Sequence, residues 1–276
     1  MSVSALFKAI HPIPAVSVTL IVAALMVARE ADPAALAWGV ASTAAGQASV
    51  GWSNDYLDRR RDAAARRLEK PLVSGRVTPR VVITAAVLAL VSCIALALPL
   101  GAAETVVMAV AVASAWAYNA GLKETVLSWL PYAVSFGLLP VFVWSATPGG
   151  GAPRPWIVAG ASLLGVAGHV MNVLPDLEGD ARAGDRGLPH RLGARGSLLV
   201  ACLVLAVMLV VVLIVARIWD DPSLAQVATA SSATVFVAAV AWSGARGRHS
   251  LGFMLTIAAA GAIALLVALS PEALRG

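Results

Sequence analysis

Long apolar runs are the feature that most restricts the folds open to this sequence. Nine such runs follow one another along the chain, each bounded by Pro, Gly or charged residues. A run of about 20 residues can cross a bilayer as a helix, whereas an open sheet in lipid would leave backbone groups unpaired. The sequence therefore predicts nine transmembrane helices, at residues 13–29, 34–53, 80–99, 103–120, 127–147, 155–174, 197–217, 225–243 and 251–270.

The composition supports a membrane protein and excludes an ordinary soluble domain. Hydrophobic residues make up 59% of the 276 residues, charged residues make up only 13%, and the mean hydropathy is +0.84. A soluble domain carries about 25% charged residues. We expect an all-α integral membrane protein, a single domain over 1–276 around a central cavity. Long polar loops at 54–79 and 175–196 follow the second and sixth runs, which predicts two similar halves, about 1–125 and 126–276.

The distribution of Lys and Arg orients the predicted helices. With the N-terminus in the cytoplasm, 16 of the 20 Lys and Arg residues fall in cytoplasmic segments, as the positive-inside rule requires. These loops account for the net charge of +5, and no nucleic-acid partner is expected. Both long polar loops then face the cytoplasm. The chain is expected to be a multi-pass protein of a bacterial inner (plasma) membrane.

Two short polar segments follow the second and sixth runs and share one pattern. The first, NDYLDRRRD, begins at residue 54, and the second, NVLPDLEGD, begins at residue 172. If each segment is helical, side chains spaced three, four, seven or eight residues apart lie on one face. The polar residues with this spacing are Asn54, Asp55, Asp58, Asp62, Asn172, Asp176 and Asp180. Two helix ends thus each present an amide and two or three carboxylates at the cytoplasmic edge of the membrane.

Carboxylates at this density repel one another unless a cation lies among them. Mg²⁺ is usually shared between a few carboxylates, water and the oxygens of a substrate phosphate. Two facing clusters would fit two Mg²⁺ ions with a diphosphate between them, and nearby Arg and Lys would balance the remaining charge. The simpler interpretation is solvated loop charges paired with the arginines. The repetition of the pattern at two helix ends next to lipid favours a functional site.

The two segments resemble the acidic motifs of one enzyme family. NDYLDRRRD is similar to the N-D-x-x-D-x-x-x-D motif of the UbiA-type intramembrane prenyltransferases, and NVLPDLEGD is similar to their N-x-x-x-D-x-x-x-D motif. The resemblance covers essentially the whole chain and implies a helical bundle with a cavity open to lipid. It also implies that two Mg²⁺ ions are held by Asn54, Asp55, Asp58, Asp62, Asp176 and Asp180, with Asn54 and Asn172 near the diphosphate of an isoprenyl donor.

Basic and aromatic residues beside these motifs complete the expected site. Tyr118 and Lys123 lie in AWAYNAGLKET, which resembles the family's Tyr…Lys segment and implies that Lys123 contacts the diphosphate. Arg66, Arg67 and Lys70 precede a turn similar to the family's; they could lie over the phosphates, bind anionic headgroups or set the topology. Two histidines, His11 and His169, are interpreted as structural.

The resemblance implies an enzyme that ionises an isoprenyl diphosphate in a dry cavity and transfers the prenyl group to a lipophilic acceptor, aromatic or quinone-precursor in nature. Asp62 is a candidate to accept the proton that is lost, and Lys123 and Tyr118 are further candidate catalytic residues. Glu124 directly after Lys123 argues against a carboxylated aromatic acceptor. The first alternative is a membrane terpene cyclase, which needs no acceptor. A phosphoribosyl transferase is ranked lower. A secondary transporter is also ranked lower, because transporters place charges near the midplane of the membrane, whereas these carboxylates lie at helix ends.

Overall fold

The computed structural model describes residues 3–182 and 186–274, and in this part of the chain all regular structure is helical. Nine of the described helices have 16 residues or more, and each coincides with one predicted run, which confirms the all-α fold. These are α2 (Pro12–Ala28), α3 (Pro33–Ala64), α4 (Pro79–Ala97), α5 (Ala102–Asn119), α6 (Leu130–Ser145), α7 (Pro155–Val173), α9 (Leu188–Val215), α10 (Leu224–Ala245) and α11 (His249–Ala268). The short helices are α1 (Val3–Lys8), α8 (Leu177–Arg182) and α12 (Pro271–Leu274).

Six described helical segments are long and apolar enough to cross a membrane. They are Pro79–Leu100, Val126–Ser145, Pro155–Ala181, Leu188–Val215, Leu224–Ala245 and His249–Ala268. Helix α2 is equally apolar but has 17 residues, and α3 ends in a strongly charged segment. The total of nine spans and the cytoplasmic N-terminus stay predictions.

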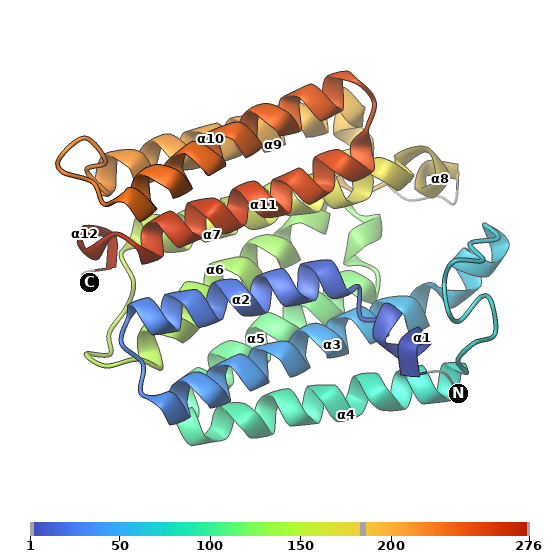
Figure 1. The fold of residues 1–276 in the computed structure, drawn as a ribbon. Coiled ribbons are helices and arrows are strands. Elements are labelled where there is room, and N and C mark those ends of the chain that lie inside the picture. Colours follow the sequence, from blue (N-terminus) through green and yellow to red (C-terminus); the bar gives the residue numbers. More distant parts are fainter. Residues whose placement is uncertain (1–2, 183–185, 275–276) are drawn as a thin grey trace.

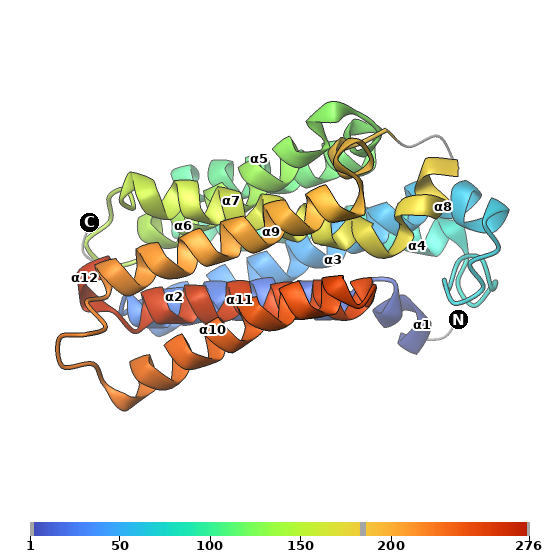
Figure 2. The same ribbon diagram turned by 90° about the horizontal axis from the view of Figure 1, so that it is seen from above.

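The long helices run side by side along one axis and form a bundle (Figures 1 and 2). Helices α2 and α3 pack together, α3 packs on α4 and α5, and α5 leads through α6 and α7 to α9. Helix α11 returns to pack on α2 as well as on α7 and α9, so the last long helix closes the bundle against the first. Helices α4 and α10 lie at its outer edges (Figure 1).

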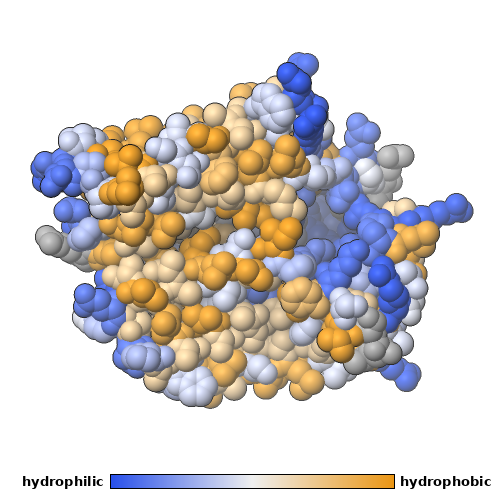
Figure 3. Space-filling model, viewed as in Figure 1, coloured by the Kyte–Doolittle hydropathy of each residue, from blue (hydrophilic) through white to orange (hydrophobic). Residues whose placement is uncertain are grey.

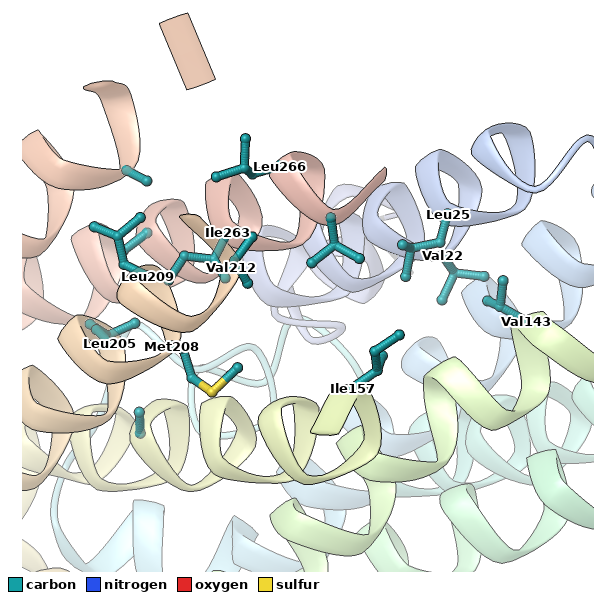
Figure 4. Close-up of a cluster of buried hydrophobic side chains, with 14 of the residues drawn as sticks. Val22, Leu25, Val143, Ile157, Leu205, Met208, Leu209, Val212, Ile263 and Leu266 are labelled. Carbon is teal, nitrogen blue, oxygen red and sulfur yellow. The ribbon is translucent and has the colours of Figure 1, made fainter. Parts of the chain in front are cut away.

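The core joins helices from both ends of the chain. Figure 4 shows Val22 and Leu25 of α2 and Ile263 of α11 in the cluster that also contains Ile157 of α7 and Leu205 of α9. Lipid is as apolar as these side chains, so close van der Waals packing holds such helices together more than burial from solvent does. The bundle is therefore held by shape complementarity between α2, α7, α9 and α11.

Polar segments gather at one end of the bundle. Helix α1, helix α8 and the loop 65–78 lie together there, while α12 lies at the opposite end (Figure 1). Figure 3 shows hydrophilic residues around a recess at the first end and mainly apolar residues along the middle. Helix α3 continues to Ala64, so the first acidic motif forms its last turns and does not belong to a loop as the predicted 54–79 boundary had it.

The second acidic motif is not one continuous helix, which corrects the expected single face. Helix α7 ends at Val173, a 3₁₀ turn covers Leu174–Asp176, and α8 begins at Leu177. Pro175 lacks the N–H that a continuing α-helix needs, and its ring clashes with the preceding turn. The expected loop 175–196 is also shorter, because α9 begins at Leu188, with a break at Gly193 where φ is 67°.

We predict that Gly51→Ala destabilises the protein by about 1–3 kcal/mol, because overpacked sites cost this much. A Cβ at position 51 would lie 2.3 Å from the backbone oxygen of Ile10, in the segment between α1 and α2. The matched control is Gly168→Ala in α7, where a Cβ would meet nothing within 4 Å. Thermal unfolding in detergent should show a lower Tm for Gly51→Ala only; an equal Tm for both variants would contradict this contact.

Candidate active site

The first part of the site links the end of α3 to the turn after α5. The Asn54 amide donates to Asp58 Oδ2 at 3.2 Å and to Asn119 Oδ1 at 3.2 Å. The Lys123 ammonium forms an ion pair with Asp58 Oδ1. The side chain of Lys123 is 11% exposed and that of Asp58 is 20% exposed, so this pair is partly shielded from solvent. The structure therefore brings three of the predicted residues together in one contact network.

The second part of the site joins the two acidic motifs through one guanidinium. Arg67 Nη1 lies 3.4 Å from Asp62 Oδ1, and Arg67 Nη2 lies 3.4 Å from Asp176 Oδ2 and 3.2 Å from Asp180 Oδ1. Carboxylates from α3, from the 3₁₀ turn and from α8 thus converge on one positive group. This convergence is the geometry that the two-motif hypothesis requires, and the sequence alone could not show it.

Burial and charge shift the protonation of this group. Burial raises the pKa of the Asp62 carboxyl above its ordinary value, with Asp58 and Asp55 adding repulsion and Lys70 and Arg67 opposing the shift. Burial alone would lower the pKa of the Arg67 guanidinium, but the nearby carboxylates outweigh it and raise the pKa. The guanidinium is therefore held firmly charged. The Asp62 carboxyl, with its raised pKa, binds a proton more readily than an ordinary aspartate does.

Asp55 is placed differently from its neighbours in the motif. It is only 2% exposed, and its Oδ1 lies 2.6 Å from Lys70 Nζ and 3.0 Å from His11 Nε2. Burial alone would raise the pKa of Asp55, but the His11 hydrogen bond and the charge of Lys70 outweigh it and lower the pKa. Its Oδ2 is buried with no hydrogen-bond partner among the described residues. Asp55 was expected among the metal ligands, yet its contacts are with the N-terminal segment and the loop 65–78.

An aromatic cluster borders the second motif. The Asn172 amide donates to Tyr132 Oη at 3.3 Å, and the Tyr118 ring packs edge-on against the rings of Tyr132 and His169, with centroids 5.1 and 5.5 Å away. His169 Nε2 lies 3.0 Å from the Ser128 hydroxyl, in keeping with the structural role expected for it. Tyr132 was missed from the sequence, because a tyrosine near the start of an apolar run also suits a membrane-interface anchor.

The protein atoms alone do not make a complete metal site. Among residues 3–182 and 186–274, no group of three or more His, Cys, Asp or Glu side chains is close enough to hold an ion unaided. A Mg²⁺ site that takes part of its ligands from water and substrate needs no such group. The fit of the site to a divalent cation rests on the three carboxylates that surround the Arg67 guanidinium. Arg66 is exposed, next to Arg67 in the chain.

A cavity lies between α2, α3, α5 and α6, deeper in the bundle than the acidic residues. Its wall includes Gln47 of α3 and Phe136 of α6 among mostly apolar residues. Gln47 has no hydrogen-bond partner within the described ranges, and it precedes Asn54 by seven residues, which is about 10 Å or two helical turns on the same face. Tyr132 stacks on Phe136 at 6.1 Å, so aromatic rings connect the cavity wall to Asn172.

The bundle and its polar end define the class: a multi-pass integral membrane protein with acidic helix ends gathered at one side. Residues 15–257 match the UbiA prenyltransferase family, and the chain belongs to this family and is a prenyltransferase. A relative, the bacteriochlorophyll synthase 33 kDa chain of Cereibacter sphaeroides, is 32% identical over 185 residues. That alignment covers 64% of this chain and 61% of the relative's length.

Solved structures share the fold at low sequence identity. The apo structure of a UbiA homolog from Aeropyrum pernix K1 has a TM-score of 0.74 and 18% identity, covering 90% of this chain and 94% of that chain. A UbiA homolog from Archaeoglobus fulgidus, bound to DMAPP and Mg²⁺, has a TM-score of 0.68 and 17% identity, covering 94% and 98%. The same homolog bound to GPP and Mg²⁺ has a TM-score of 0.68. These likenesses show the UbiA fold.

We predict that Arg67→Met lowers the Tm in EDTA by roughly 2–4 °C, as expected for a loss of about 1 kcal/mol. The variant leaves Asp62, Asp176 and Asp180 without their shared cation. Mg²⁺ should then raise the Tm of Arg67→Met more than that of the wild type, because it replaces the missing charge. Arg66→Met, at an exposed neighbouring position, is the matched control and should keep the wild-type Tm. Equal Mg²⁺ responses in all three proteins would argue against a shared cation site.

Proposed function

We propose that this chain is a Mg²⁺-dependent prenyltransferase that ionises an isoprenyl diphosphate at the polar end of α3 and α7. The released prenyl cation then alkylates a lipophilic acceptor, aromatic or quinone-precursor in nature. The observation that carries the proposal is the convergence of Asp62, Asp176 and Asp180 on one cationic group. Carboxylates from both motifs meet there, so a diphosphate could be shared between them.

The donor diphosphate is proposed to lie between the two motifs. Asn54, Asp58, Asp62, Asp176 and Asp180 are the proposed ligands for Mg²⁺, two ions being expected, and bound Mg²⁺ would offset the charge that develops on the leaving pyrophosphate. Lys123 and Arg67 lie against these carboxylates and can turn to the phosphate oxygens. Tyr118, Lys70 and Asn172 border the same region and are assigned to the diphosphate, with Arg66 at its exposed edge. Asp62 is the proposed acceptor of the proton, because burial raises its pKa.

The cavity favours transfer to a polar acceptor over cyclisation. A half-buried amide without a hydrogen-bond partner gains from a polar ligand, whereas a cavity that only folds a hydrocarbon chain gains nothing from it. Gln47 supplies such an amide to the cavity wall. An acceptor with a carbonyl or hydroxyl group would satisfy it. A cyclase acting without acceptor is the second candidate.

The acceptor is proposed to react at a site without a dedicated basic partner for a carboxylate. The residue after Lys123 is the acid Glu124, which forms an exposed ion pair with Arg61 at 3.1 Å. This position therefore offers no positive charge to an acceptor carboxylate. The bacteriochlorophyll synthase relative makes a large aromatic ring system one acceptor to test, beside quinone precursors. The acceptor is proposed to reach the prenyl cation from the membrane, where the helical bundle borders lipid.

We predict that the purified protein in detergent, with a lipophilic acceptor added, releases pyrophosphate from geranylgeranyl diphosphate in the presence of Mg²⁺ and not in EDTA. Asp58→Ala and Asp176→Ala should each lower the rate by at least about 100-fold, because each removes a proposed ligand of the Mg²⁺ that would offset the charge developing on the leaving pyrophosphate. Asp220→Ala, at the opposite end of the bundle, is the control and should keep the rate. An absence of release with donors of every length would overturn the enzyme proposal, and release without acceptor would favour a cyclase.

We predict that Gln47→Leu raises the acceptor KM by about tenfold while the donor KM stays near wild type, since the variant loses the hydrogen bond that the Gln47 amide is proposed to form with the acceptor. The control is Thr43→Val, which lines the same cavity but already donates its hydroxyl to Gly39 O at 2.8 Å within α3. Products from membranes supplied with donor are measured by mass spectrometry. Equal acceptor KM values in Gln47→Leu and wild type would show that Gln47 does not contact the acceptor.

A further inference from the structure

Asp55 stands at the junction of three segments that are distant in sequence. Its Oδ1 meets the Lys70 ammonium at 2.6 Å, from the loop 65–78, and His11 Nε2 at 3.0 Å, from the segment that joins α1 to α2. The side chain of Asp55 is 1% exposed, whereas that of His11 is 43% exposed, so the carboxylate is the buried centre of the group. Both basic partners lie on Oδ1, and Oδ2 is buried without a hydrogen-bond partner among the described residues.

The segments around Asp55 also pack together through apolar contacts. Ala5 of α1 forms a small buried cluster with Val77 and Val82, separate from the main core, and Leu6, Trp52, Tyr56 and Leu72 pack against it. The Trp52 indole donates to Leu6 O at 2.9 Å. Gly51 allows the Ile10 backbone to approach α3 closely. Helix α1, the end of α3 and the loop 65–78 therefore form one unit, which we call the N-terminal clamp.

The clamp holds the loop that brings cations to the site. Lys70 is fixed by Asp55, and three residues earlier Arg67 reaches Asp62, Asp176 and Asp180. A lysine side chain has four rotatable bonds and about 2 kcal/mol of rotamer entropy, so a buried counter-charge is an effective way to hold it in place. A loop tied at Lys70 presents Arg67 toward the acidic convergence with little freedom to move away.

We propose that Asp55 is a positioning residue and not a Mg²⁺ ligand. It anchors Lys70 and, together with His11, docks the N-terminal segment against the loop that presents Arg67 and Lys70 to the donor diphosphate. The inference rests on the proposed function for its catalytic consequence, whereas the anchoring itself is independent of activity. It gives His11 a part in positioning, where the sequence indicated a structural residue, and it separates Asp55 from Asp58, only three residues away.

Enzyme kinetics distinguish a positioning role of Asp55 from a role as Mg²⁺ ligand. The enzyme is assayed for pyrophosphate release from geranylgeranyl diphosphate while Mg²⁺ is varied, for wild type, Asp55→Asn and Asp58→Asn. Asp55→Asn should raise the donor KM by about tenfold, the usual loss for one charge-assisted contact, and leave the Mg²⁺ concentration for half-maximal rate unchanged. Asp58→Asn should raise that Mg²⁺ concentration by at least about tenfold. The same rise in Asp55→Asn would overturn the proposal.

A double-mutant cycle tests whether Asp55 acts through Lys70. In a Lys70→Met background, Asp55→Asn should change the donor KM by less than about twofold. If Asp55 acts only through Lys70, the first substitution already removes their interaction and the second has little left to remove. A metal ligand would show its full effect in either background, and that result would reject the positioning role. The His11 side chain is partly exposed, and His11→Ala removes no buried charge. This variant therefore replaces Asp55→Asn in the assay if Asp55→Asn folds poorly. It should raise the donor KM by a smaller factor than Asp55→Asn, and an unchanged donor KM would remove His11 from the clamp.

Limited proteolysis tests the anchoring without any enzymatic reaction. Trypsin should cut after Arg67 and Arg76 several times faster in Asp55→Asn than in wild type, because a released loop opens to the protease more often. Cleavage after Arg246, between α10 and α11, is the internal control and should not change. Equal cleavage of the loop in both proteins would disprove the anchoring. A wild-type protein that releases no pyrophosphate would disprove the proposed function instead, and the proteolysis result would still stand.

Discussion

Charge balance at the edge of the hydrocarbon region is the constraint on which this structure depends. Carboxylates in such a place are stable only when cations lie beside them. The chain supplies the carboxylates mainly from helix ends and the cations from loops. Lys123 pairs with Asp58, and Lys70 pairs with Asp55. Arg67 pairs with Asp62, Asp176 and Asp180. Because each loop is held by its cation, the same pairs that neutralise the acidic residues also fix the connections between the helices.

Most of the helical framework could be predicted from the sequence, because a bilayer demands long apolar runs and nothing else fills that pattern. The Thr78 hydroxyl accepts from Val81 N and caps the start of α4, where Pro79 is the first helical residue. The ends of helices inside polar segments were harder to predict from the sequence. Helix α3 runs on through its charges to Ala64, whereas α7 ends at Val173, two residues before Pro175. Periodicity is similar in both segments, and backbone chemistry decides between them.

The sequence could indicate which residues gather at this end of the bundle, but it could not give the partner of each residue. Spacing places Asp55, Asp58 and Asp62 on one broad face of α3, and that prediction carries no information about which loop lies over each side chain. In the structure Asp55 turns to the N-terminal segment and Asp58 to the turn after α5. Side chains about 60° apart around a helix can meet different neighbours. Tertiary packing between distant segments sets these pairings, so no local pattern could have revealed them.

Arg67 connects the charge balance to the proposed chemistry. Its guanidinium lies where carboxylates from both motifs converge, so the protein keeps its acidic residues together through its own ion pairs. A divalent cation brought with a diphosphate would compete for the same carboxylates, and the guanidinium would then be released beside the phosphate oxygens. In the proposed mechanism, the positive charge for the leaving group would thus already be present before the donor binds. In such a site the acidic motifs and the basic loop act as one unit, since neither is stable at the membrane edge without the other.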